Sequence, residues 1–249
     1  MKIILSPTKK MKEDRDSLGF QDLPASLSKT RQILSRLLEL SPEQLQSLWQ
    51  CNDRIAAQNI ERLSSMDLTA QLTPALLAYE GIAFQYMAPT VFSDRELQYV
   101  QEHLRILSGF YGVLKPLDGV RSYRLEMQAP LQIGTHRDLY AFWGKDLYEG
   151  VRDHSGIILN LASKEYSKCI QPYLNADDRL ITCFFGEDVN GKLRQKGTFA
   201  KMARGEMVRY LAENQAESPE VMKGFDRLDF HFLPDLSTDI QYVFERRPS

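Results

Sequence analysis

Hydrophobic residues recur along the chain in two kinds of pattern, and the shorter pattern is typical of buried strands. Residues 2–5 form an apolar run that ends at Ser6-Pro7, and residues 156–161 (GIILNL) form a second one. Short, continuous apolar runs predict strands that are covered on both faces. Asn190-Gly191 predicts a hairpin turn after a later strand. The predicted strands are residues 2–5, 156–161, 179–187, 228–233 and 239–244.

Longer segments repeat their apolar residues every three or four positions, as amphipathic helices do. One such segment contains Ser41-Pro42-Glu43, a typical helix start with proline at the first helical position. We find no internal repeat or clear linker. The sequence therefore predicts a mixed α/β (α+β) fold, in which helices surround a mixed central sheet within a single compact domain, 1–249. The predicted helical segments are 26–65, 75–89 with an interruption at Gly81, 139–147 and 199–211.

The stretch 94–126 joins a helical pattern to a run of glycines and basic residues. Apolar residues fall at helical spacing from Leu97 to Leu107, and Gly109 and Gly112 follow. A helix, a tight glycine turn and a second apolar turn predict a helix-hairpin-helix element. Backbone N–H groups without partners in such a turn can face a phosphate. The same glycine spacing is common where two helices pack closely, and that interpretation stays open.

Basic side chains gather at two places along the chain. Residues 192–209 contain six Lys or Arg residues and one acid, Glu206. Lys201 and Arg204 are three residues apart in the helix predicted there, on a face separate from its apolar stripe, so they can reach one ligand together. A solvated basic face is the alternative, but this density in a mildly acidic protein favours an anionic partner. The other group of basic residues lies in the central stretch 94–126 and comprises Arg105, Lys115, Arg121 and Arg124.

Two loops after predicted strands are further candidate sites. The strand 156–161 runs directly into a predicted helix, so Asn160, Ser163 and the first helical N–H groups could face an anion or a nucleotide. Lys9 lies in the polar loop after the first strand, where binding residues are often found. An ordinary strand–helix junction and a charged turn are equally compatible with these two patterns.

Composition narrows the class of protein. The 249 residues are 43% hydrophobic and 26% charged, as in ordinary globular proteins. The net charge of −2 excludes polyanion binding by overall charge, so any such binding must come from a local patch. The N-terminal apolar run is too short for a signal peptide, and no segment reaches transmembrane length. Three widely spaced cysteines predict no disulfide, so we expect a cytoplasmic protein without membrane contact.

Motifs for catalysis and metal binding are missing from the sequence. Its four histidines lack metal-ligand spacing, and it has no phosphate-binding glycine loop, dinucleotide fingerprint or nucleophile elbow. We therefore assign no catalytic residue, no metal ligand and no cofactor, and we leave open whether the protein is an enzyme.

Six blocks of the sequence, taken together and in order, are specific to one known family. They are LSPTKKM, HLRILSGFYGVLKPLDGVRSYRLEM, LYAFWG, IILNLASKEY, FAKMARGEMVRYL and VFERR. Over nearly its full length, the chain resembles the YaaA family of bacterial peroxide stress proteins.

The resemblance implies cytoplasmic proteins that protect cells against hydrogen peroxide, in part by limiting the free iron that drives Fenton chemistry. It also implies an unusual α/β fold with a helix-hairpin-helix element and a positively charged cleft, and it implies DNA binding. The scattered histidines and cysteines offer no site for direct iron sequestration, so any effect on iron would be indirect.

Carried onto this chain, the resemblance places the hairpin at residues 108–115, flanked by basic residues, and a cleft wall at Lys9, Lys164, Lys201 and Arg204. The leading prediction is a monomer that binds double-stranded or structured DNA largely without reading its sequence. The predicted DNA-binding residues are Lys9, Arg105, Gly109, Gly112, Lys115, Arg121, Arg124, Lys164, Lys201 and Arg204.

The rival prediction is an enzyme that acts on a nucleobase or nucleotide in a polar pocket near Asn160 and Arg124. Glu126 is the obvious general acid or base among the residues nearby. A small anionic ligand at the strand–helix junction is the remaining option if DNA does not bind. The candidate pocket residues are Ser6, Glu126, Asn160, Ser163 and Tyr166.

Overall fold

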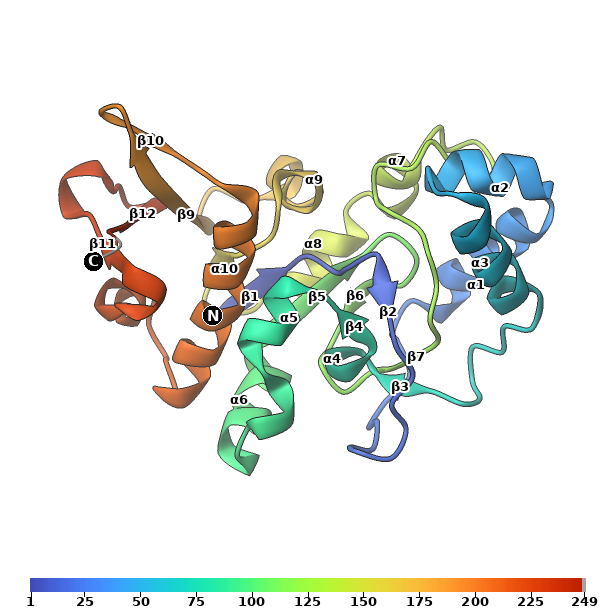
Figure 1. Ribbon diagram of the computed structural model, residues 1–249, viewed down its shortest axis with the longest axis horizontal. Helices are drawn as coiled ribbons and strands as arrows, with labels where there is room; N and C mark the ends of the chain where they lie inside the picture. The colour runs from blue at the N-terminus through green and yellow to red at the C-terminus, as the bar shows by residue number, and fades with distance from the viewer. Residues whose placement is uncertain (248–249) are drawn as a thin grey trace.

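An eight-stranded sheet forms the centre of the computed structural model, which describes residues 1–247 (Figure 1). Its strands are β1 Lys2–Leu5, β5 Leu104–Ser108, β6 Gly112–Leu114, β8 Ile157–Asn160, β9 Arg179–Val189, β10 Lys192–Arg194, β11 Phe230–Phe232 and β12 Gln241–Arg246. They follow the order β11-β12-β9-β8-β1-β5-β6, and β10 pairs with β9. Strands β1, β5, β8, β9 and β12 run parallel, whereas β6, β10 and β11 pair antiparallel with their neighbours. The predicted mixed central sheet is confirmed.

Strand β1 lies in the middle of this sheet because it is apolar on both faces. Ile3, Ile4 and Leu5 are all buried. β1 pairs in parallel with β5 on one side and β8 on the other, so Ile3 lies opposite both Leu104 and Leu159. Parallel sheets that are covered by helices require strands of this kind. The strands predicted near residues 2–5, 156–161 and 179–187 are thus confirmed.

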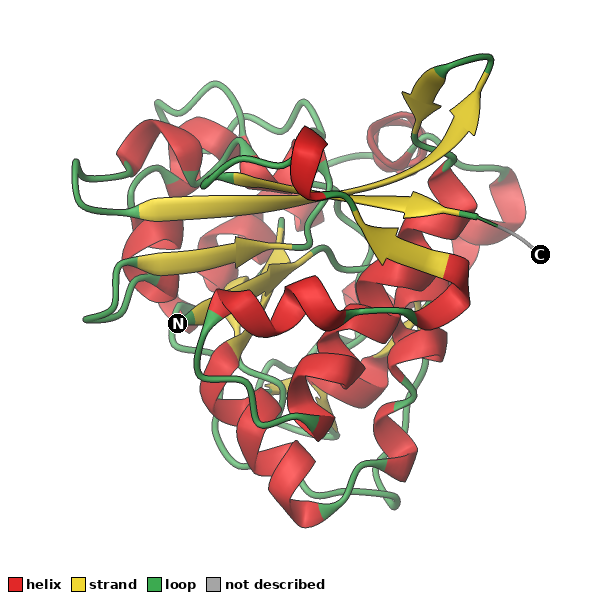
Figure 2. Ribbon diagram, turned by 90° about the vertical axis from the view of Figure 1, so that its left-hand side faces the viewer, coloured by secondary structure: helices red, strands yellow, loops and turns green. Residues whose placement is uncertain are grey.

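Helices surround the sheet (Figure 2). The α-helices are α1 Leu27–Leu38, α2 Pro42–Trp49, α3 Asp53–Ser64, α4 Ala75–Ala78, α5 Ile82–Met87, α6 Asp94–His103, α7 Leu139–Trp143, α8 Asp146–Val151, α9 Lys164–Ser167 and α10 Gly197–Glu213. Short 3₁₀ helices are η1 Pro89–Val91, η2 Gln171–Tyr173, η3 Pro219–Gly224, η4 Arg227–Asp229 and η5 Pro234–Leu236. Two small strand pairs lie outside the main sheet, namely β2 Lys10–Met11 with β4 Tyr79–Glu80, and β3 Thr73–Pro74 with β7 Gly119–Val120.

The helices α1, α2 and α3 form a group at the end of the molecule away from β9 to β12 (Figure 1). α2 begins with a capping box, in which Ser41 and Gln44 each accept a backbone hydrogen bond from the other. Asn52 caps α3 by accepting a bond from the N–H of Ile55. These helix starts follow the sequence pattern, and one continuous hydrophobic core runs from Met1 to Phe244.

The helix-hairpin-helix prediction for 94–126 is wrong. The helix α6 ends at His103, and the apolar residues after it form β5, which turns through Gly109–Tyr111 into β6. Two N–H groups of this turn are already engaged within the protein, because the Ser108 hydroxyl accepts bonds from the N–H groups of Phe110 (3.2 Å) and Tyr111 (2.9 Å). Burial and pairing beside β1 make these residues a strand, although their apolar spacing is that of a helix.

Helix α10 packs directly against α5 through Gly205. A Cβ atom at Gly205 would lie 1.9 Å from the carbonyl oxygen of Ala83, well inside any normal contact distance. Only glycine therefore allows the two helices to approach so closely. This contact also fixes the turn of α10 that carries Lys201 and Arg204, the two basic residues singled out from the sequence.

Candidate functional site

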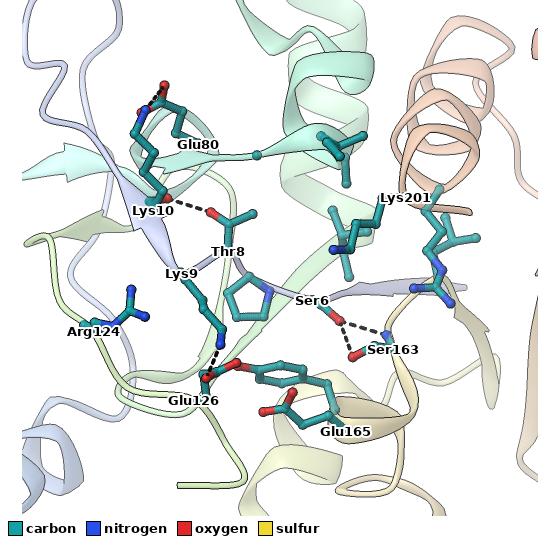
Figure 3. Close-up of a pocket in the computed structure, with 18 of the residues that line it drawn as sticks. Ser6, Thr8, Lys9, Lys10, Glu80, Arg124, Glu126, Ser163, Glu165 and Lys201 are labelled. Carbon is teal, nitrogen blue, oxygen red and sulfur yellow. Dashed lines mark hydrogen bonds and ion pairs between the residues drawn. The ribbon is translucent and has the colours of Figure 1, made fainter. Parts of the chain in front are cut away.

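A pocket of about 460 Å³ opens where the loops after β1 and β8 meet (Figure 3). Both loops follow the carboxyl ends of adjacent parallel strands. The strand order reverses at β1, because the chain adds β5 on one side of it and β8 on the other. Ligands of open α/β sheets bind at such a reversal. Three other segments complete the walls, namely 80–83 around the start of α5, 123–126, and the part of α10 that carries Lys201 and Arg204.

Hydrogen bonds between the two loops hold this edge of the pocket. The Ser6 hydroxyl accepts a bond from the N–H of Ser163 (2.8 Å) and donates one to its hydroxyl (3.2 Å). Asn160 lies beneath the loop and does not line the pocket. Its side chain accepts from the N–H of Ala162 (3.0 Å) and donates to the hydroxyl of Thr182 (3.1 Å). Ser6 and Ser163 are therefore available to a ligand, whereas Asn160 supports the loop.

Three cationic side chains at the pocket, Arg124, Lys201 and Arg204, have no carboxylate partner within the described residues 1–247. The Nε–H groups of Arg124 and Arg204 are buried and have no hydrogen-bond acceptor there. Arg124 makes only a long contact of 3.5 Å to the carbonyl oxygen of Trp49. Burial lowers the pKa of the Arg204 guanidinium. Since buried polar groups are normally bonded, these two side chains are suited to an anion that enters the pocket.

The carboxylates of the pocket differ in their partners. Glu126 forms an ion pair with Lys9 (2.6 Å), and Glu80 forms one with Lys10 (2.8 Å). Glu165 has no ion-pair partner in the part of the chain that the structure describes, and one of its oxygens accepts a bond from the N–H of Gln128 (3.2 Å). Burial, opposed by that hydrogen bond and reinforced by the charge of Glu126, raises the pKa of Glu165. Glu165 thus takes up a proton more readily than an ordinary glutamate does.

Two tyrosines supply aromatic surface to the pocket. Tyr123 lies in a buried chain of hydroxyls, 2.6 Å from the hydroxyl of Ser108 and 2.9 Å from that of Tyr79. Burial raises the pKa of Tyr123 to about 12 and that of Tyr166 well above its ordinary value. Both phenols therefore stay neutral near pH 7 and offer a ligand their rings.

The structure brings together only part of the residues that the sequence singled out. Of the predicted residues, Ser6, Lys9, Arg124, Glu126, Ser163, Tyr166, Lys201 and Arg204 line the pocket. Gly109 and Gly112 are buried in and beside the β5–β6 turn, where Gly112 lies against Trp143. The predicted basic residues that do not line the pocket are Arg105, Lys115, Arg121 and Lys164.

Sequence reasoning missed other pocket residues because their partners are distant in the chain. Lys10 and Glu80 form an ion pair between β2 and β4. Glu165 received no role, although it lies in the recognised ASKEY block. Gly81 was the available signal, because a Cβ atom there would lie 2.6 Å from the methyl carbon of Thr8. That glycine allows the chain to pass close to the loop after β1.

Comparison with known proteins identifies the family. The family described as "Peroxide stress protein YaaA" matches residues 1–236 of the chain. The chain belongs to the YaaA family. UPF0246 proteins are similar to it, with 58% identity over 247 residues in Agathobacter rectalis (99% of both chains) and 53% over 244 residues in Lachnoclostridium phytofermentans (98% of this chain and 96% of that protein). A UPF0246 protein of Pediococcus pentosaceus is 49% identical over 244 residues (98% and 97%).

Two features are absent from the part of this YaaA family member that the structure describes. None of the described helices has both the length and the apolar character needed to cross a membrane. Within the same residues, no three or more His, Cys, Asp and Glu side chains gather in a way that could hold a metal ion.

Two of the three cysteines, Cys169 and Cys183, are expected to react slowly with oxidants. Burial raises the pKa of the Cys169 and Cys183 thiols to about 12, and the thiolate is the reactive form. We expect iodoacetamide at pH 7.5 to label the half-buried Cys51 first, with Cys169 and Cys183 labelled only after unfolding. Peptide mass spectrometry of native and urea-treated protein measures this order. Rapid labelling of Cys169 or Cys183 in native protein would contradict it.

Proposed function

We propose that this protein binds DNA in the peroxide stress response, largely without reading base sequence, through the basic rim of the pocket. The observation that carries the proposal is the group of Arg124, Lys201 and Arg204 around one pocket, without carboxylate partners among residues 1–247. Guanidinium and ammonium groups are the usual ligands of backbone phosphates. The contacts come from the pocket rim and not from a helix-hairpin-helix turn.

DNA suits this surface better than an isolated anion because the cationic groups extend beyond the pocket. The side chains of Lys9 and Lys10 are 53% and 74% exposed, and each can exchange its carboxylate partner for a phosphate. Exposed ion pairs of this kind contribute little to stability, so the exchange costs little. With a net charge of −2, the protein concentrates its attraction for DNA at this rim.

The membership of the YaaA family connects this proposed binding to peroxide. Fenton chemistry generates radicals from iron and hydrogen peroxide, and DNA phosphates attract cationic iron. A protein whose own cations occupy those phosphates displaces bound counterions. We propose that this displacement is how the chain limits iron-dependent damage to DNA, which would make its effect on iron indirect.

Fluorescence anisotropy of labelled duplexes across salt concentrations tests the proposal. We expect binding of unrelated duplex sequences with similar affinity, and a logarithm of affinity that falls by about 0.9 for each phosphate contact per tenfold rise in salt. Three to five contacts from the pocket rim would then give a slope of roughly −3 to −5. Absence of binding to any duplex at low salt would overturn the proposal.

A second candidate function is an enzyme that acts on a base or nucleotide. Glu165 favours it, because its raised pKa and its place in the pocket suit a general acid. Glu126, the acid or base expected from the sequence, is engaged by Lys9. Mass spectrometry of damaged duplexes after incubation with the protein measures this activity. If the bases and strands of every substrate stay unchanged, the enzymatic function is contradicted, and DNA binding remains as the single proposed function.

A further inference from the structure

The pocket carries two kinds of charge, and a lone phosphate would not satisfy both. Lys201 points toward Ser6 on one side, and the carboxyl groups of Glu126 and Glu165 lie across the pocket from it (Figure 3). A phosphate is attracted by the first wall and repelled by the second. The arrangement suits a ligand that is anionic at one end and carries N–H donors at the other.

The pocket also has an apolar surface, made of Leu5, Pro7, Leu161 and the ring of Tyr166, which follow or flank the ends of β1 and β8. A planar ring can bury its faces against such side chains. The volume of about 460 Å³ lies within the range of pockets that enclose small organic ligands. A ligand with a flat ring system at its centre therefore fits this part of the pocket.

These features are those of one nucleotide. Resting on the proposed DNA binding, we propose that the pocket receives a single nucleotide extruded from the bound DNA and favours bases that carry an exocyclic amino group. Its phosphate binds Lys201 and Arg204, its ring lies against the apolar surface, and its amino group donates to Glu165. A single extruded base can be read in this way at its Watson–Crick edge.

Glu165 is the acceptor because of how its neighbours are engaged. Lys9 holds the carboxylate of Glu126, whereas the carboxyl of Glu165 accepts a bond from the N–H of Gln128 and has no ion-pair partner among residues 1–247. Adenine, cytosine and guanine present an amino donor at this edge. Thymine presents carbonyl oxygens on both sides of its ring N–H, and these oxygens repel a carboxylate. The pocket should therefore discriminate against thymine.

Duplexes with a single bulged nucleotide test the proposal, because an unpaired base costs least to extrude. Anisotropy is measured for bulged dA, dC or dT, for a bulged abasic site and for the perfect duplex. We expect bulged dA and dC to bind about tenfold more tightly than bulged dT, the effect of one hydrogen bond to a charged group. Glu165→Gln should reduce this ratio to about twofold or less, because an amide can donate to thymine as well as accept.

Two controls separate this proposal from the function on which it rests. Glu149→Gln, on an exposed residue of α8 that pairs with Lys145, should keep the tenfold ratio. Calorimetry with 5′-dAMP and 5′-dTMP measures the pocket without a duplex. Equal affinities for all bulges, together with salt-dependent duplex binding, would overturn the nucleotide pocket and leave DNA binding intact. If no duplex binds in the anisotropy measurement, the proposed DNA binding is overturned. If 5′-dAMP and 5′-dTMP bind with equal affinity in calorimetry, the proposed base preference of the pocket is overturned.

Discussion

Replacing Arg204 with methionine is expected to weaken DNA binding about 10- to 100-fold, the effect of losing hydrogen bonds to a charged group. Arg204 is largely enclosed, and its Nε–H group has no acceptor among the described residues. A phosphate that reaches Arg204 therefore accepts hydrogen bonds from a guanidinium group that is poorly hydrated at this position. Anisotropy should also show the salt slope reduced by about one unit, equally for unrelated duplex sequences.

The stability of the same variant distinguishes this role from a structural one. A partly buried charge without a partner disfavours the folded state, so Arg204→Met should unfold at the same temperature as the natural protein or higher. Lys192→Met, on an exposed residue of β10 with no ion pair in the part described, is the matched loss of one positive charge. It should change affinity less than twofold. Equal effects of the two substitutions would mean that Arg204 contributes only overall charge.

Replacing Gly205 with alanine is expected to destabilise the protein by about 3 kcal/mol, as overpacking of a close helix contact does. The added methyl group would occupy space now filled by the carbonyl oxygen of Ala83, 1.9 Å away, and backbone cannot rotate aside as a side chain can. For a chain of this size the midpoint of thermal unfolding should fall by about 6–12 °C. Because α10 must move, DNA affinity should fall as well. Circular dichroism and anisotropy measure the two effects.

Gly197→Ala is the control on the same helix. A Cβ atom at Gly197 would meet nothing within 4 Å. Alanine favours the helix more than glycine does, so this variant should keep or slightly raise the melting temperature. A small effect of Gly205→Ala, similar to that of Gly197→Ala, would show that α5 and α10 can separate without cost. The position of Lys201 and Arg204 would then depend on other contacts.

The fold was predictable where a local sequence pattern is compatible with only one kind of secondary structure. The run KIIL is too short for a helix and too apolar for a surface loop, so its assignment as a buried strand is correct. The stretch from Leu104 to Ser108 was not predictable in this way. Its apolar residues continue the spacing of α6, and only pairing with β1, far away in the sequence, makes them a strand. Hydrophobic periodicity reports the local preference of a segment for helix or strand. It does not show which distant segment the residues pair with, and here that pairing decides the structure.

The site was predictable in the same partial sense. Lys201 and Arg204 share one face of a helix, and spacing within a helix is enough to show it. The residues of the two loops followed from the rule that strand ends carry function. The opposite wall combines Glu126, which the sequence singled out, with Glu165, which it did not. The ion pair of Lys10 with Glu80 depends on the pairing of β2 with β4, two segments that lie far apart in the chain. Arg105 and Arg121 are basic near a glycine turn, but they bond to the protein itself.

The central position of β1 has a consequence for how the protein is made. The ribosome releases β1 before β5 and β8, yet Ile3 pairs with Leu104 and Leu159, which are synthesised much later. Contacts between such distant residues slow folding because a long loop must close before they form. During synthesis this apolar strand stays unpaired until β5 and β8 have been made, and unpaired apolar strands tend to aggregate. Chaperones that cover short apolar segments should therefore engage the nascent chain until β8 has emerged.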